Sequence, residues 1–528
     1  MIYLYYSPLG QIFGQFLKVF SSILSQEGLK NEIVTSIPDT IQPQDIWFCI
    51  WEGSNKLPTN CIVYNMDPFE VSVLNNFKNL MSHTKYQRFI DYCSLPYHKH
   101  TLFGNNIFKY YLLPFGYSKV QEWKNTQENT QENTQENKFI EESDVLLYGD
   151  PSPRRLEILD KLETALTEKG YKFLWMSGLI GKNLENAIKK TKIVISVSNH
   201  YYREIKANDL ARLSLPISNK VCVIVEEGDD SVMQSFADVM PMFKTTDDLI
   251  KMSLTLLEDA DLRKRIGENC YTVLKNTYNL DRSLVQVMFP KINYVIATYI
   301  REDDLNCLKN HLNTLEKVFK DKEEKGIPNF ISQITIVIPN TTEHLSKFVN
   351  DYYSLRLCLH DIPVKYIYME NSQMMSYSQW TRVLDISEGF DYYILMEDDW
   401  YVHPKNITFD QELVYYHTQK LNKNPGYLGL WCPHDYDNLP HHIAISVGMI
   451  SENTVMKLGK GTIRDQLMEQ NMYCQLAFSW LFKKKEYDIP DISEEYIVPY
   501  WNAHAKKLVD FTKKGTREIL VPKEYIIS

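Results

Sequence analysis

The stretch YYILMEDDWYVHP, from Tyr392 to Pro404, sets three carboxylates directly after a run of apolar and aromatic residues. The apolar run predicts a buried strand, and Glu397, Asp398 and Asp399 follow at its end. Neighbouring carboxylates repel one another unless water or a cation neutralises them. Mg²⁺ and Mn²⁺ prefer carboxylate oxygens and keep open positions for phosphate. The triplet therefore predicts a cation site, with a solvated turn as the alternative.

The segments around the triplet alternate between strand and helix from Lys291 onward. Four runs predict strands, INYVIATYI, QITIVIPN, VKYIYMENS and YYILM, with a charged helix to Lys325 and a second helix around Trp380 to Ile386. Ligands of such α/β sheets bind beyond the carboxyl ends of the strands. The triplet is therefore expected at the ligand-binding edge of its sheet.

Length and composition describe a multidomain globular chain. Its 528 residues predict about three or four domains, and its net charge of −10 argues against a nucleic-acid binder. Nine cysteines are scattered singly, without a CxxC pair, which favours the reducing cytosol. No segment reaches membrane-spanning length without charges, so only peripheral membrane contact is expected. We expect a cytoplasmic protein; the sequence leaves the oligomeric state open.

A polar repeat, TQENTQENTQEN, from Thr126 to Asn137, cannot bury a core and predicts a solvated linker. Before it, MIYLYYSPLGQIFGQFLKVF predicts a strand, a glycine loop and a helix. After it, VLLYGD, YKFLWMSG and KIVISVS predict strands separated by helices, followed by the strand VCVIVEE and closing helices through Tyr278. This alternation is typical of a doubly wound parallel sheet.

Several enzyme classes are disfavoured by missing motifs. The sequence contains no GxGxxG and no GxxxxGK[ST], which argues against Rossmann dehydrogenases and P-loop enzymes. A phosphatase of the haloacid dehalogenase type needs a second Asp two residues after its nucleophile, but Trp400 stands at that offset from Asp398. A nucleotide-sugar pyrophosphorylase would carry an early Gly-rich loop that this chain lacks.

Residues from about 291 to 480 resemble a GT-A glycosyltransferase domain. VIATYIRED (295–303) is similar to the family's opening strand and nucleotide loop, and ILMEDDW is similar to its DxD metal motif in the EDD form. The resemblance implies that Asp399 binds Mn²⁺ or Mg²⁺ directly, with Glu397 as a further candidate ligand, while Glu397 and Asp398 are also candidates for contacts with the donor's ribose or a metal-bound water. It further implies nucleotide contacts at Thr298, Arg301 and Asp303, a phosphate or sugar contact at Arg382, and a late metal ligand at His504. Ordinary turns, a solvated arginine and a structural histidine are the alternatives.

Downstream, residues 426–451 resemble the acceptor side of this family, with Trp431 as a sugar platform and His434 or Asp435 at its edge. A core Trp with a polar turn is the alternative. Many inverting members carry an acidic pair at the start of a late helix as the general base. Here the corresponding stretch is NMYCQLAFSWLF, so Asp465 and Glu469, which lie upstream, become substitute candidates. Inversion or retention stays open.

Residues 1 to about 285 resemble a second architecture, GT-B, in the form found in relatives of spore-coat glycosyltransferases. LPFG (113–116) stands where that family crosses between lobes, and GDPSPRRLEIL opens the second lobe. The resemblance implies that Glu226 or Glu227 accepts the ribose hydroxyls. It also implies a metal-free diphosphate site made by Arg154, Arg155, His200 and Arg212, helped by helix N-termini. A helix start with solvated arginines on an inactive scaffold is the alternative.

The expected fold class is α/β, with a GT-B-like pair of Rossmann-like lobes followed by a GT-A-like α/β domain. The expected parts are residues 1–120 (first lobe), 121–142 (linker), 143–288 (nucleotide-binding lobe) and 289–528 (GT-A-like domain). The expected activity is transfer of a sugar from a nucleotide diphosphate sugar to a glycan or other hydroxyl acceptor, with Mn²⁺ or Mg²⁺ at the later site and a second, metal-free activity at the earlier one. A non-catalytic glycan-binding or scaffold protein and a metal-dependent phosphohydrolase are the alternatives.

Overall fold

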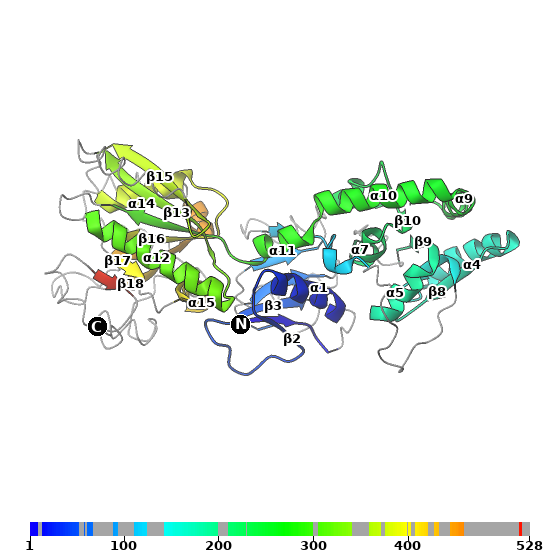
Figure 1. Ribbon diagram of the computed structural model, residues 1–528, viewed down its shortest axis with the longest axis horizontal. Coiled ribbons are helices and arrows are strands. Elements are labelled where there is room, and N and C mark those ends of the chain that lie inside the picture. Colours follow the sequence, from blue (N-terminus) through cyan, green and yellow to red (C-terminus); the bar gives the residue numbers. More distant parts are fainter. Residues whose placement is uncertain are drawn as a thin grey trace.

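Three sheets with covering helices follow one another along the long axis of the molecule in a computed structural model (Figure 1). It describes residues 1–8, 13–51, 57–58, 61–66, 88–92, 110–123, 142–198, 210–228, 230–298, 305–340, 358–370, 375–398, 400–402, 407–420, 427–431, 444–458 and 517–519. The expected mixed α/β fold class with parallel sheets is confirmed. The TQEN repeat lies outside the described residues.

The first sheet lies in the middle of Figure 1 and consists of parallel strands. Its strands are β1 (Ile2–Tyr5), β2 (Asn31–Val34), β3 (Ile46–Trp51), β4 (Cys61–Asn65), β5 (Arg88–Asp91) and β6 (Tyr110–Leu112), in the order β2-β1-β3-β4-β5-β6. Helix α1 (Phe13–Gln26) buries Leu17, Phe20 and Leu24, which recur at helical spacing and so form its core-facing stripe.

The second sheet, at the right of Figure 1, is also parallel. Its strands are β7 (Ser143–Tyr148), β8 (Phe173–Met176), β9 (Thr191–Ser196), β10 (Cys222–Glu226) and β11 (Met242–Phe243), in the order β8-β7-β9-β10-β11. The helices of this region are α4 (Pro153–Glu168), α5 (Gly181–Lys189), α7 (Leu210–Ser218), α8 (Ser231–Gln234), α9 (Thr246–Glu258), α10 (Ala260–Thr277) and α11 (Leu280–Met288). Helix α4 begins as its sequence dictates, with Ser152 as N-cap and Pro153 in the first turn.

The third sheet, at the left of Figure 1, mixes strand directions. Its strands are β12 (Ile292–Ala297), β13 (Ile331–Asn340), β14 (Cys358–Leu359), β15 (Ile362–Glu370), β16 (Tyr392–Glu397), β18 (Tyr427–Trp431) and β19 (Ala444–Ser451), in the order β14-β15-β13-β12-β16-β19-β18. Strands β12, β13, β15 and β16 are parallel, whereas β19 runs antiparallel to β16. Helices α12 (Leu305–Lys325), α14 (Met375–Ile386), α15 (Phe409–Lys420) and α16 (Glu452–Leu458) belong to this region. The short strands β17 (Trp400–Val402) and β20 (Arg517–Ile519) pair separately.

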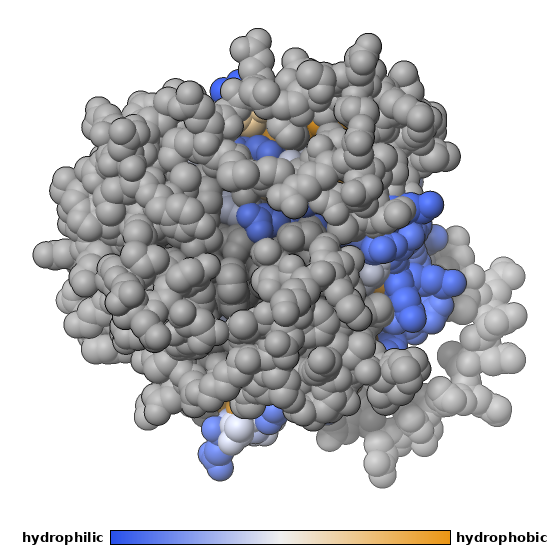
Figure 2. Space-filling model, turned by 90° about the vertical axis from the view of Figure 1, so that its left-hand side faces the viewer, coloured by the Kyte–Doolittle hydropathy of each residue, from blue (hydrophilic) through white to orange (hydrophobic). Residues whose placement is uncertain are grey.

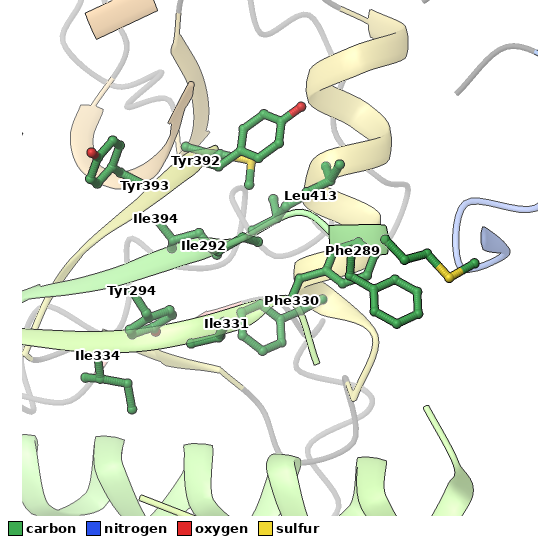
Figure 3. Packing of buried hydrophobic residues seen from close by; sticks show 14 of the residues in the cluster. Phe289, Ile292, Tyr294, Phe330, Ile331, Ile334, Tyr392, Tyr393, Ile394 and Leu413 are labelled. Carbon is green, nitrogen blue, oxygen red and sulfur yellow. The ribbon is translucent and has the colours of Figure 1, made fainter. Parts of the chain in front are cut away.

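One continuous hydrophobic core joins the first and third sheets. It includes Ile2 and Phe48 from the first sheet and Ile334 from the third. At the joint, Phe289 stacks on Phe330 with ring centroids 5.8 Å apart (Figure 3). The second sheet has two separate clusters of its own. The first and third sheets are therefore packed as one body, and the second sheet is attached to it.

The chain runs between the first and second sheets twice, and the two crossings bind each other. Tyr117 donates its N–H to the carbonyl of Tyr278 at 2.8 Å, and Leu280 donates to the carbonyl of Tyr117 at 2.7 Å. A Cβ atom on Gly116 would lie 1.9 Å from the carbonyl oxygen of Tyr278, so only glycine fits there. Beyond the crossing, α11 packs its buried Leu284 into the core of the first sheet.

Among the described helices, none is long and apolar enough to cross a membrane. Seen from the end of the molecule that holds the third sheet, the described residues that reach the surface are mostly hydrophilic (Figure 2).

Candidate functional sites at two sheet edges

Glu397 and Asp398, the described carboxylates of the acidic triplet, lie where the strand order of the third sheet reverses. From β12 the chain adds β13 and then β15 on one side, and afterwards adds β16 on the other side. Ligands of open α/β sheets bind outside the carboxyl ends of the strands at such a reversal. Ala297 is in register with Glu397, so Thr298 and Asp398 leave the sheet side by side. The structure thus brings together three residues that the sequence nominated separately: Thr298, Glu397 and Asp398.

The polar atoms of Thr298 are committed to the scaffold. Its hydroxyl donates to the carbonyl of Val337 at 2.8 Å, and its N–H donates to Oε1 of Gln379 at 3.0 Å. Nε2 of Gln379 returns a bond to the carbonyl of Thr298 at 3.1 Å. With 1% of its surface exposed, Thr298 fixes the end of β12 to β13 and α14. Gln379 was missed by the sequence analysis, because nothing in its local pattern distinguishes it from a surface glutamine.

The two described carboxylates of the triplet differ in burial. Glu397 is half-buried, whereas Asp398 is 6% exposed and donates its N–H to the carbonyl of Ala297 at 3.0 Å. Asp399, the nominated direct metal ligand, lies outside the described residues. Within the described part of the chain, no three His, Cys, Asp or Glu side chains cluster as a cation site. A cation here therefore depends on Asp399 joining Glu397 or Asp398.

A buried histidine that the sequence analysis did not single out lies against this acidic turn. His311 of α12 is completely buried, and its Nε2 lies 2.8 Å from the hydroxyl of Tyr294 on β12. Burial lowers the pKa of His311 to about 3, and the backbone of Asp398 opposes that lowering. His311 is therefore neutral at pH 7 and touches both the sheet and the turn.

Other nominated residues of this half do not join the cluster within the described chain. Arg382 is exposed on α14, one turn after Gln379 and further from the carboxyl edge. Trp431 is the last residue of β18. The remaining nominations lie outside the described residues: Arg301, Asp303, His434, Asp435, Asp465, Glu469 and His504.

A second reversal of strand order occurs in the second sheet, between β7 and β9. Helix α4 follows β7, so its first turn and its N-cap lie at this reversal. Arg154 and Arg155 stand in that turn, at the positive end of the helix dipole, and the N–H of Arg155 donates to the hydroxyl of Ser152 at 3.2 Å. This is the edge at which the sequence nominated a diphosphate site.

Arg154 and Glu226 form a two-pronged ion pair across this edge. Nη1 of Arg154 donates to Oε2 of Glu226 at 2.9 Å and to the carbonyl of Ser198 at 2.6 Å, and Nη2 pairs with Oε1. The N–H of Ser198 donates to Oε2 of Glu226 at 3.1 Å. The pair therefore ties the start of α4 to the ends of β9 and β10. Glu227, the other ribose nomination, is exposed and pairs with Lys244 at 3.0 Å.

Two further arginines converge on Gly149, directly after β7. Arg155 is 2% exposed and donates to the carbonyls of Val197 and Asp150, each at 2.7 Å. Nη1 of Arg212 donates to the hydroxyl of Ser196 at 3.2 Å. A Cβ atom on Gly149 would lie 3.1 Å from Nη1 of Arg155 and 3.5 Å from Nη2 of Arg212. The edge thus combines bare backbone with two cationic groups, which is the chemistry that anions prefer. His200, also nominated here, lies outside the described residues.

Comparison with known proteins gives no family and a group of distant structures. No family model matches the chain, and no curated protein matches it. T4 phage BGT in complex with UDP and Mn²⁺ is 13% identical, with a TM-score of 0.34, covering 52% of this chain and 95% of that chain. Anabaena HepE in complex with UDP and glucose is 10% identical, with a TM-score of 0.32, covering 54% of this chain and 98% of that chain. The mannosyltransferase PcManGT from Pyrobaculum calidifontis, in complex with GDP-Man and Mn²⁺, is 8% identical, with a TM-score of 0.24, covering 44% of this chain and 55% of that chain.

Proposed function

We propose that this chain is a glycosyltransferase that moves a sugar from a nucleotide diphosphate sugar to a hydroxyl group of a glycan or another acceptor. The observation that carries the proposal is the placement of Glu397 and Asp398 beside Thr298 at the reversal of strand order in the third sheet. Adjacent carboxylates at a ligand-binding edge suit a divalent cation, and a diphosphate is the ligand that such a cation bridges.

In this proposal, Asp399 and Glu397 hold Mn²⁺ or Mg²⁺, and His504 is a further candidate ligand. The cation supplies charge neutralisation for the departing nucleoside diphosphate when it is bound. Asp398 contacts the donor's ribose or a water on the cation. Asp435, Asp465 and Glu469 are the candidates for taking the proton of the acceptor hydroxyl. Arg301 and Asp303 are the candidates for the nucleotide.

The edge of the second sheet is proposed as a second nucleotide site that needs no metal. Arg212 and the first turn of α4 would face the diphosphate, since guanidinium groups and helix N-termini both stabilise phosphate oxygens. Arg155 acts there through the loops it ties, because its nitrogens already donate to two carbonyls. Glu226 would accept a ribose hydroxyl while keeping its pairing with Arg154. The proposed parts remain 1–120, 121–142, 143–288 and 289–528.

Nucleotide release from UDP-, GDP- and dTDP-sugars, with and without Mn²⁺ and with a mixture of acceptors, tests the proposal. The full-length protein is compared with Asp399→Ala, Arg212→Gln and the matched control Glu388→Ala, an exposed carboxylate of the same region. We expect Mn²⁺-dependent release that Asp399→Ala abolishes and Glu388→Ala retains. Metal-independent release that Arg212→Gln lowers would support the second site.

Two outcomes would replace the proposal. Absence of nucleotide release from every donor, together with retained glycan binding, would favour a non-catalytic glycan-binding or scaffold protein. Release of inorganic phosphate from simple phosphate esters without sugar transfer would favour a metal-dependent phosphohydrolase.

A further inference from the structure

Two ion pairs lie next to each other at the carboxyl edge of the second sheet, and they differ in burial. Arg154 and Glu226 have side chains that are each 11% exposed. In the adjacent pair, the side chains of Lys244 and Glu227 are 73% and 44% exposed. An exposed pair contributes little to stability, whereas a buried pair needs further hydrogen bonds to offset its desolvation. The hydrogen bonds around the buried pair therefore show what it can do.

The guanidinium group of Arg154 directs most of its N–H groups at the protein. Nη1 donates to Oε2 of Glu226 at 2.9 Å and to the carbonyl of Ser198 at 2.6 Å, and Nη2 donates to Oε1 of Glu226. Nε is buried. Since a guanidinium group has five N–H donors, a ligand could reach at most the second N–H of Nη2. Arg154 is therefore poorly placed to bind a phosphate directly.

The carboxylate of Glu226 keeps one acceptor position within the described part of the chain. A carboxylate has about four lone-pair positions, two on each oxygen. Oε2 accepts from Nη1 of Arg154 and from the N–H of Ser198 at 3.1 Å, whereas Oε1 accepts from Nη2 alone. One position on Oε1 is left for a donor from outside. The two-pronged pairing fixes the rotation of the carboxylate and so determines where this position points.

This acceptor position lies close to the anchor of a second arginine. Ser196 of β9 is in register with Val225 of β10, and Glu226 is the next residue and the last of that strand. The hydroxyl of Ser196 accepts from Nη1 of Arg212 at 3.2 Å. The edge thus places an acceptor for a hydroxyl beside a cationic group. A nucleoside diphosphate matches this combination, because its ribose hydroxyls donate and its phosphates attract a guanidinium group.

We propose that Arg154 is a positioning residue of the second nucleotide site: it holds the carboxylate of Glu226 so that Oε1 accepts one ribose hydroxyl of a nucleoside diphosphate. The inference rests on the nucleotide site proposed for this edge and deepens it. Arg154 acts on the ribose through Glu226, and the phosphates are left to Arg212 and the first turn of α4.

Two substitutions separate the geometry of Arg154 from its charge. Arg154→Lys keeps the positive charge but cannot form the two-pronged pairing. Arg154→Met keeps the apolar stem and removes the charge. The matched control is Lys244→Met, which breaks the adjacent, exposed pair with Glu227 at the same edge.

The test is binding of UDP, 2′-deoxy-UDP and 3′-deoxy-UDP to the full-length protein, measured by isothermal titration calorimetry in EDTA, which removes any contribution from a metal-dependent site. The urea unfolding midpoint is measured for each variant, so that binding is compared only under conditions in which the variant is folded. We expect both Arg154 variants to bind UDP about tenfold more weakly than the wild type, and Lys244→Met to bind it equally well. For the analogue that lacks the hydroxyl accepted by Glu226, wild-type binding should already be about tenfold weaker, and the Arg154 variants should lose less than about twofold more.

Two results would overturn the role of Arg154. Equal losses for UDP and for both deoxy analogues would do so, because Arg154 would then act on the phosphates or on the fold as a whole. Wild-type affinity for UDP in Arg154→Lys would also do so, because charge alone would then suffice. If the wild type binds neither UDP nor GDP in EDTA, the nucleotide site itself is absent from this edge, and the role of Arg154 falls with it.

Discussion

Arg88 of the first sheet and Asp391 of the third sheet form a buried ion pair across the boundary between these sheets. Their side chains are 1% and 10% exposed. The guanidinium carbon of Arg88 lies 3.7 Å from the ring centroid of Tyr111, whose hydroxyl also bonds to Asp391. The N–H of Lys291 donates to the same carboxylate at 2.8 Å. The charged joint therefore lies beside the hydrophobic core that the two sheets share.

Breaking this pair should destabilise the body formed by the first and third sheets. Arg88→Met leaves the carboxylate of Asp391 buried without its cation, and removal of one partner of a buried pair costs about 3–5 kcal/mol. The measurement is the urea dependence of tryptophan fluorescence. Lys161→Met is the control, since its pair with Glu157 at 3.3 Å is exposed and should change the free energy of unfolding by less than about 0.5 kcal/mol. Equal effects of the two substitutions would contradict the assigned role of Arg88.

Gly116→Ala should disrupt the double crossing between the first and second sheets. The added methyl would overlap the carbonyl of Tyr278, 1.9 Å away, so the two crossings must separate and lose their mutual hydrogen bonds. We expect a loss of about 2 kcal/mol or more, and faster limited proteolysis near residues 116–123. Gly170→Ala is the control, because its φ of +78° carries strain but its Cβ would meet open space. A smaller loss for Gly116→Ala than for Gly170→Ala would contradict the steric argument.

Buried and exposed thiols should react in a fixed order. Burial raises the pKa of Cys222 and of Cys270 to about 12, whereas Cys358 is exposed. Iodoacetamide at pH 8.5 should label Cys358 first, with Cys222 and Cys270 reacting only when denaturant is added; peptide mass spectrometry measures each site.

The raised pKa values of Cys222 and Cys270 also determine how the stability of the folded protein changes with pH. The folded pKa values lie above the unfolded value of about 8.5, so the folded state keeps these protons longer. Their contribution to stability is complete below about pH 8.5 and is lost as the pH rises through the folded values near 12. Early labelling of Cys222 in native protein would contradict both expectations.

Of the two arginines beside Gly149, we expect Arg155 to stabilise the fold and Arg212 to bind the nucleotide. Arg155→Gln removes bonds to two backbone carbonyls in a buried place and should lower the free energy of unfolding by about 2 kcal/mol or more. Arg212→Gln should unfold nearly as the wild type does and bind UDP or GDP about tenfold more weakly, about 1.4 kcal/mol. Urea titration and isothermal titration calorimetry measure the two effects. The reverse pattern would exchange the two roles.

Local patterns predicted the elements that place both candidate sites. The apolar run before the triplet predicted β16, which ends at Glu397. The stretch GDPSPRR lies between the predicted strand VLLYGD and the predicted helix, and α4 begins there with Ser152 as N-cap and Pro153 in its first turn. Alternation of strand and helix predicted the α/β class, because periodicity and caps are local properties of the chain.

Local sequence patterns could not predict contacts between residues that are far apart in the chain. Arg154 meets Glu226 across 72 positions, and Arg88 meets Asp391 across 303 positions. Gln379 and His311 carry no local signal, because their partners Thr298 and Asp398 come from other elements. The cysteines are scattered singly along the sequence, but in the structure the thiols of Cys49 and Cys61 lie together on the adjacent strands β3 and β4.

The sequence by itself determined where strands end and therefore which charged side chains stand at the ligand-binding edges, since strand and helix periods are set by residues a few positions apart. Only the tertiary structure decided which of those side chains are committed to the scaffold. Thr298 and Arg155 belong to that group. Strand order and burial bring backbone carbonyls from distant parts of the chain within hydrogen-bond distance of these two side chains, and buried polar groups must be hydrogen-bonded.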